Sequence, residues 1–235
     1  MNYKTIGIMG GMGSLSTVDL FSKIVNNTSA KCDQEHLPVL IDNYPKVPDR
    51  TDSLLHNGES PLPYLIKSAT RLKSCGADFL LLACNAVHNF IDEVSREVEI
   101  ESINGLEETA NEVSRLKYSK IAMLGTERFL RKVDFSTYYK NHDIDVIIPN
   151  TEEQCVINNV IYKGIKAGRD IDDVKILSAL KRLYEEGAEV FVLSCTELPI
   201  AFDKYGIHHY LTIYSSLVMA KTAIKKAGVT LLHDA

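Results

Sequence analysis

Two stretches of the sequence repeat one pattern of residues at distant places in the chain. Residues 76–88 read GADFLLLACNAVH, and residues 187–199 read GAEVFVLSCTELP. Each starts with Gly-Ala and an acidic residue, continues as an apolar run and reaches a cysteine, at a constant offset of 111 residues (187 − 76 and 195 − 84). A second pair, TIGIMGG at 5–11 and KIAMLGT at 120–126, keeps the same order at an offset of 115 (120 − 5). We therefore predict that the chain contains a duplicated unit.

Short apolar runs alternate with longer amphipathic stretches along the whole chain. The runs are apolar on consecutive residues, as expected of strands covered on both faces, and lie at 3–10, 38–43, 78–83, 120–125, 144–149 and 189–194. The helical patterns between them tend to end at glycine, as at Gly76 and Gly187. This alternation predicts an α/β fold of two similar lobes, each with a mainly parallel four-stranded sheet flanked by helices, related by a pseudo-two-fold axis.

The repeat also sets the expected domain boundaries. We place the N-terminal α/β lobe at residues 1–103 and the C-terminal α/β lobe at 104–211. A further helical pattern at about 212–228 can pack back on the first lobe.

Composition argues against several classes of partner. The net charge of −5 and the absence of a basic cluster argue against nucleic acid and against an anionic membrane. No apolar run approaches the length of a membrane span, and the first residues do not resemble a signal peptide, so we expect a cytoplasmic protein. The five cysteines lack framework spacing and should be free thiols, and we expect Cys32, Cys75 and Cys155 to fill the core.

Cys84 and Cys195 differ from the other cysteines because each follows a predicted strand. Ligands of open α/β sheets bind outside the carboxyl ends of the strands. If the lobes face each other, the active site lies in the cleft between them and the thiols approach a ligand from opposite sides. One thiolate could then remove a proton from a carbon while the opposed thiol delivers a proton to its other face. Helix N-termini after the strands would favour the thiolate forms.

The chain resembles the cofactor-independent aspartate/glutamate racemases over most of its length. The resemblance rests on GIMGGMGSLST at 7–17, PDRT at 48–51, ACNAVHNF at 83–90, LGT at 124–126, IYKGIKAG at 161–168 and SCTELP at 194–199. The aspartate branch fits better than the glutamate branch. GGMG replaces the Asp-Ser that is typical of glutamate racemases, and the second cysteine motif reads Cys-Thr-Glu rather than Cys-Thr-His.

The resemblance implies an isomerase that interconverts L- and D-aspartate, with specific roles for individual residues. Cys84 and Cys195 would be the catalytic acid/base pair, with Cys195 acting on the L-enantiomer and Cys84 on the D-enantiomer. Arg50 would bind substrate carboxylates, and Lys166 would lie near the same site. The remaining substrate-binding positions are Gly11, Met12, Gly13, Asn85, Ala86, Thr126, Thr196 and Glu197. The resemblance further implies no cofactor, no metal, an acidic amino acid as substrate and a homodimer.

The sequence of the turn at Gly11–Gly13 indicates a carboxylate-binding site even without the resemblance. It follows a predicted strand and opens a helix, where backbone N–H groups suit a carboxylate. It has neither the dinucleotide-binding nor the phosphate-loop spacing of glycines. A plain turn before a helix remains the alternative.

Ala86 departs from the family pattern. The family usually reads Cys-Asn-Thr-Ala-His where this chain has Cys-Asn-Ala-Val-His, so a threonine hydroxyl is missing. One lost hydrogen bond to a charged group costs about 1.5–3 kcal/mol. This leaves open a glutamate or broad-specificity racemase, or an isomerase or decarboxylase of the same superfamily. A non-catalytic acid-binding or redox-responsive protein also remains open. So do a zinc site made of Cys84, His88, Cys195 and Glu197, and a core or orienting role for His88.

Overall fold

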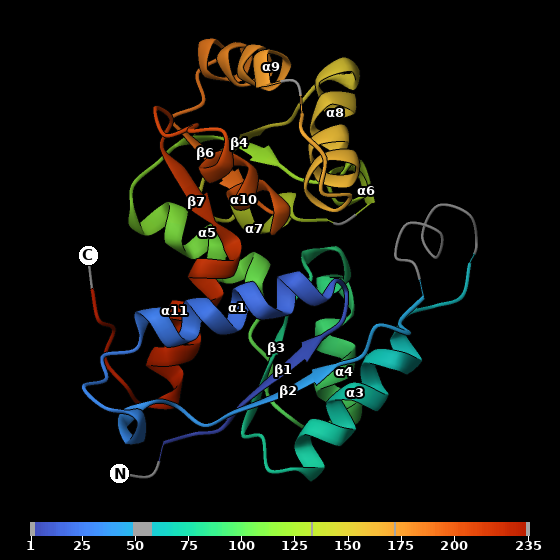
Figure 1. Cartoon of the computed structure of the whole chain (residues 1–235), viewed down its shortest axis with the longest axis vertical. Helices are drawn as coiled ribbons and strands as arrows, with labels where there is room; N and C mark the ends of the chain where they lie inside the picture. Colours follow the sequence, from blue (N-terminus) through green and yellow to red (C-terminus); the bar gives the residue numbers. More distant parts are fainter. Residues whose placement is uncertain (1–2, 49–57, 133, 172, 234–235) are drawn as a thin grey trace. The chain divides into compact units, whose positions relative to one another are not determined.

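The computed structural model describes residues 3–48, 58–132, 134–171 and 173–233, and its chain divides into two compact units (Figure 1). The first unit comprises Met1–Glu108 together with Ser216–Ala235. The second unit comprises Thr109–Ser215. Nearly all of the C-terminal helix therefore belongs to the same unit as the N-terminal residues.

The first unit is built on a parallel sheet with the strand order β2-β1-β3. Its strands are β1 (Ile6–Gly10), β2 (Val39–Asn43) and β3 (Phe79–Leu82). The prediction of four strands is wrong for this unit. Residues 101–103 lie beside β3, where Leu80 N donates to Glu101 O at 2.8 Å and Ile103 N donates to Leu80 O at 2.9 Å. They form one isolated bridge instead of a strand because the segment is short: one helix ends at Val98 and the next begins at Gly105.

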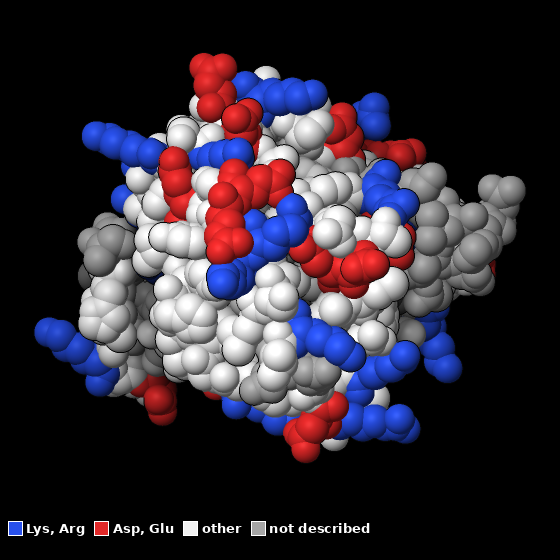
Figure 2. Space-filling model, turned by 90° about the horizontal axis from the view of Figure 1, so that it is seen from above, with Lys and Arg blue, Asp and Glu red and all other residues white. Residues whose placement is uncertain are grey.

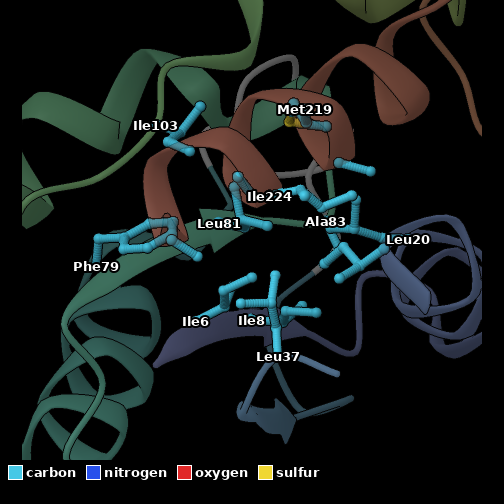
Figure 3. Close-up of a cluster of buried hydrophobic side chains, with 14 of the residues drawn as sticks. Ile6, Ile8, Leu20, Leu37, Phe79, Leu81, Ala83, Ile103, Met219 and Ile224 are labelled. Atoms are coloured by element: carbon cyan, nitrogen blue, oxygen red, sulfur yellow. The ribbon is translucent and has the colours of Figure 1, made fainter. Parts of the chain in front are cut away.

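Helices cover both faces of the first sheet. They are α1 (Ser14–Asn27), α3 (Leu62–Ser74), α4 (Ile91–Val98) and α11 (Ser215–Ala227). Side chains of α1 and α11 pack with Ile6, Ile8 and Leu81 on one face, as Figure 3 shows. Side chains of α3 and α4 pack with Met9 and Leu82 on the other face. Alternate residues of each strand therefore enter different cores, which explains why the strands are apolar at consecutive positions.

The second unit contains a parallel sheet with the order β5-β4-β6-β7. Its strands are β4 (Lys120–Leu124), β5 (Asp145–Ile147), β6 (Val190–Leu193) and β7 (Thr212–Tyr214). The helices within it are α6 (Glu127–Lys132), α7 (Ser136–Lys140), α8 (Thr151–Asn158), α9 (Asp173–Glu185) and α10 (Glu197–Lys204). α5 (Gly105–Arg115) begins in the first unit and ends in the second.

Strand β7 corrects the predicted start of the C-terminal helix. Residues 212–214 pair with β6, and α11 begins only at Ser215. The run Thr212-Ile213-Tyr214 consists of β-branched and aromatic residues, which favour a strand over the first turn of a helix. The second sheet therefore has the predicted number of four strands, but its fourth strand consists of residues that we assigned to the start of the helix.

A capping box fixes the start of α8. The Asn150 side chain accepts from Glu153 N at 3.0 Å, and the Glu153 carboxylate accepts from Asn150 N at 2.8 Å. α8 continues without a break into η3 (Asn159–Ile165), a π-helical segment. The apolar sides of α8, η3, α9 and α10 share one core with β4 and β6.

The two units repeat the same local structure around their third strands. Gly76 and Gly187 each follow a helix with positive φ values of 96° and 103°, which only glycine adopts readily. Ala83 N donates to Met9 O at 3.0 Å, and Ser194 N donates to Leu124 O at 2.8 Å. The strand orders β2-β1-β3 and β5-β4-β6 also correspond. These matches support the duplication inferred from the sequence.

The surface carries mixed charge where Figure 2 shows it. Acidic and basic side chains lie next to one another on that face. Ion pairs of this kind include Arg182 with Glu153 and with Glu186. Cys32, Cys75 and Cys155 are exposed, so the prediction that they fill the core is wrong. Cys75 caps the end of α3 and Cys155 lies on the outer side of α8, where their backbones are helical but their side chains face solvent. Of the helices described, none is long and apolar enough to cross a membrane.

Candidate active site

Strand β3 places Cys84 at the carboxyl edge of the first sheet. The strand ends at Leu82, and Cys84 has an extended backbone immediately before the short 3-10 helix η2 (Asn85–Phe90). The residue is half-buried. Its carbonyl oxygen accepts from Val87 N at 3.4 Å and lies 3.0 Å from Nδ1 of His88. The turn that presents the thiol is therefore held by hydrogen bonds to its own backbone.

His88 is a core histidine, and it also orients this turn. The core role and the orienting role considered from the sequence therefore both apply. Only 2% of the residue is exposed. Burial lowers the pKa of His88 from 6.5 to about 4, against a smaller opposing effect of the hydrogen bond to Cys84 O. Because a carbonyl oxygen can only accept, we assign the proton of the neutral ring to Nδ1. A side chain at Gly105 would collide with Nε2 of His88 and with Met219, so Gly105 keeps room for the ring.

We expect His88 to remain neutral down to about pH 5 in the folded protein. Its folded pKa lies below its ordinary value, so its contribution to stability is complete above about pH 6.5 and is lost as the pH falls toward 4. Between these limits, protonation of His88 in the unfolded chain lowers the free energy of unfolding by about 3 kcal/mol. Imidazole proton–carbon NMR spectra recorded from pH 8 to pH 4 would check this. A His88 resonance that titrates near pH 6.5 would contradict the burial argument.

The glycine turn after β1 lies at the same edge of the first sheet. Gly11 has a φ of 88°, and a Cβ there would overlap the backbone of Tyr44. Its N–H donates to Thr17 Oγ1 at 3.0 Å, and the Thr17 hydroxyl donates to Gly13 O at 3.2 Å. Met12 is buried and Gly13 caps α1. Thr17 therefore shapes the turn and already accepts from one of the predicted donors, a role that the sequence analysis did not assign.

Strand β6 places Cys195 at the carboxyl edge of the second sheet, where a carboxylate contacts it. Sγ of Cys195 donates to Glu197 Oε2 at 2.9 Å, and Thr196 Oγ1 donates to the same oxygen at 3.1 Å. Glu197 is the first residue of α10 and is only 8% exposed. Burial, followed by the charge of Glu197 and its hydrogen bond, raises the pKa of the Cys195 thiol well above its usual range.

Lys166 reaches the same cluster from the end of η3. Its Nζ lies 3.5 Å from Glu197 Oε1 and 5.2 Å from the centre of the Tyr162 ring. The π-helical segment ends at Ile165, directly before Lys166. Such segments often occur at functional sites. The positive charge of Lys166 opposes the effect of Glu197 and lowers the pKa of Cys195.

The other residues predicted for the site lie on different elements from this cluster. Thr126 follows β4, and its Oγ1 accepts from Phe129 N at 3.3 Å at the start of α6. Asn85 and Ala86 are the first two residues of η2. Arg50 lies outside the described residues.

Within the second unit, the structure thus brings together Cys195, Thr196, Glu197 and Lys166.

Arg128 on α6, which is only 3% exposed, was not singled out from the sequence. The sequence feature that could have drawn attention to Arg128 is its position two residues after the LGT motif at 124–126. In the described part of the chain, no three His, Cys, Asp or Glu side chains gather as a possible metal site.

Comparisons with known proteins support one family. The family model for Asp/Glu/hydantoin racemases matches residues 9–212. The broad specificity amino-acid racemase RacX of Bacillus subtilis (strain 168) is 26% identical over 226 residues, covering 93% of this chain and 96% of the relative.

Two solved structures show the same fold at 25% sequence identity. The aspartate racemase of Picrophilus torridus has a TM-score of 0.82, covering 97% of this chain and 96% of its own. An aspartate racemase homologue from Pyrococcus horikoshii OT3 has a TM-score of 0.79, covering 95% and 99%. The family match spans both cysteine motifs and most of both units. The chain therefore belongs to the Asp/Glu/hydantoin racemase family and is an amino-acid racemase of that family.

Proposed function

We propose that the protein interconverts L- and D-aspartate by cofactor-independent proton transfer at the α-carbon, with Cys84 and Cys195 as the two acid/base residues. One observation carries the proposal: each unit presents one cysteine at the same register of its sheet. The preceding residues, Ala83 and Ser194, donate in the same way to the ends of β1 and β4. Inversion requires one acid/base group on each face of the α-carbon, which two cysteines at equivalent positions of the repeat supply.

The proposed reaction moves one proton at each face of the substrate. With L-aspartate, the Cys195 thiolate takes the α-proton, and the Cys84 thiol delivers its proton to the opposite face of the planar carbanion. With D-aspartate, the two cysteines exchange roles. Charge that develops on the α-carboxylate needs hydrogen-bond donors. We assign this task to Arg50, Thr126 and Thr196, together with the backbone N–H groups of the turn at residues 11–13.

Aspartate is the proposed substrate because two structurally similar proteins are an aspartate racemase and an aspartate racemase homologue. A second candidate is a broad-specificity amino-acid racemase. It is favoured by the likeness to RacX and by Ala86, which lacks the hydroxyl that family members usually place beside Asn85.

Proton NMR of single enantiomers in D2O would test the function. We expect the reduced enzyme to replace the α-proton of both L- and D-aspartate by deuterium, with the opposite enantiomer appearing on a chiral column. The same assay with glutamate and neutral amino acids separates the two candidates, since an aspartate racemase should act on aspartate at least about 10-fold faster, a difference of about 1.4 kcal/mol. Exchange without inversion, or no exchange with any amino acid, would overturn the proposal.

A further inference from the structure

The two cysteines have different neighbours two residues further along the chain. This position is Ala86 after Cys84 and Glu197 after Cys195. The Glu197 carboxylate accepts a hydrogen bond from the Cys195 thiol at 2.9 Å. At Cys84 the equivalent side chain is a methyl group, and within the described residues no carboxylate is hydrogen-bonded to its sulfur. The duplication has therefore kept the thiol in both units and a carboxylate in one.

Glu197 is held in a fixed position beside the thiol. It is 8% exposed, and its two oxygens make separate contacts. Oε2 accepts from Cys195 and Thr196, while Oε1 lies 3.5 Å from Lys166 Nζ. Among the described residues, the charged groups that act on Cys195 are Glu197 from α10 and Lys166 from the end of η3. A buried carboxylate with these partners is suited to holding a proton on the thiol, and it is engaged before any substrate binds.

We propose that Glu197 is a positioning residue that keeps Cys195 in its protonated thiol form, so that the two cysteines of this racemase are chemically unequal in the resting enzyme. The inference rests on the proposed function for its catalytic meaning, and it replaces the substrate-binding role that the sequence suggested for Glu197. Lys166 acts on Cys195 in the opposite sense, because its positive charge favours the thiolate.

The proton balance of this arrangement is simple. When Cys195 delivers its proton, the S–H bond breaks, a C–H bond forms at the α-carbon and the electron pair stays on sulfur. The new thiolate then lies beside the Glu197 carboxylate, and the repulsion between like charges favours its return to the thiol. The proton returns when the thiolate removes an α-proton from another substrate molecule or takes one from water.

The inference can be tested in the absence of substrate by measuring how fast each of the two thiols is alkylated. Iodoacetamide would be applied at a series of pH values, and mass spectrometry would follow the peptides of Cys84 and Cys195 from the same protein. In Glu197→Gln, we expect the pH of half-maximal alkylation rate at Cys195 to fall by about one unit or more, while that of Cys84 is unchanged. In Lys166→Met, we expect the value for Cys195 to rise.

The opposite directions of the two variants separate a local charge effect from damage to the fold. Circular dichroism and thermal unfolding would show whether each variant is folded, and Lys166→Met keeps the test decisive if Glu197→Gln is not. An unchanged Cys195 profile, or equal shifts at both cysteines, would overturn the inference. A shift at Cys195 alone in an enzyme that racemises no amino acid would uphold the inference about Glu197 and reject the proposed function.

Discussion

Cys84→Ser and Cys195→Ser are each expected to lower racemisation by about 10³-fold or more, in both directions. Each substitution removes the acid/base group on one face of the substrate while the other face keeps its thiol. A serine hydroxyl is a much weaker acid than a thiol and cannot form the corresponding anion near neutral pH. Initial rates from L- and D-aspartate, measured by chiral chromatography, would establish the loss in each direction.

The matched control for these variants is Cys155→Ser. Cys155 is an exposed thiol in α8 of the second unit, so the same chemical change there should leave the rate within about twofold of wild type. A Cys84→Ser or Cys195→Ser enzyme with wild-type rates from both enantiomers would refute the two-thiol mechanism. Loss of activity in all three variants would indicate damage to the fold.

Leu20→Ala is expected to destabilise the first unit by about 2–5 kcal/mol, the largest effect on stability that we predict for an apolar side chain of α1. Leu20 is 1% exposed and lies in the core with Ile8, Leu81 and Met219 (Figure 3). Truncation removes apolar contacts and leaves a cavity that the surrounding strands and α11 cannot fill by small shifts. Chemical denaturation monitored by circular dichroism would measure the change in the free energy of unfolding.

Leu15→Ala in the same helix supplies the control. Leu15 is 68% exposed, so its truncation removes little packing, and the difference in helix propensity is the same as at position 20. We expect a change within about 0.5 kcal/mol. Equal losses for the two variants would contradict the assignment of Leu20 to the core.

The strands and their parallel order were predictable because a sheet covered on both faces requires apolar residues at consecutive positions. Ile6, Ile8 and Met9 illustrate this: the first two enter one core and Met9 enters the other. The missing fourth strand of the first unit was not predictable from the repeat alone. Whether residues 101–103 extend into a strand depends on where α4 ends and α5 begins, and helix ends are set by tertiary packing.

For the candidate site, the sequence pointed to individual residues but not to the contacts between them. The repeat identified Cys84 and Cys195 because both follow a strand at the same register. The contact between Glu197 and Cys195 depends on the first turn of α10, and the approach of Lys166 depends on the π-helical segment before it. Apolar periodicity at 3.6 residues does not reveal a π-helical segment, so neither contact could be read from the spacing of the motifs.

The placement of α11 determines when the core of the first unit can form during synthesis. Met219, Ala220, Ala223 and Ile224 of this helix belong to the core formed by β1 and β3. The second unit is synthesised before residues 216–227 of α11, so the first unit receives this core helix only after the second unit has been made. A nascent chain that has not yet added residues 216–235 would hold the second unit and a first sheet whose α1-covered face still lacks α11.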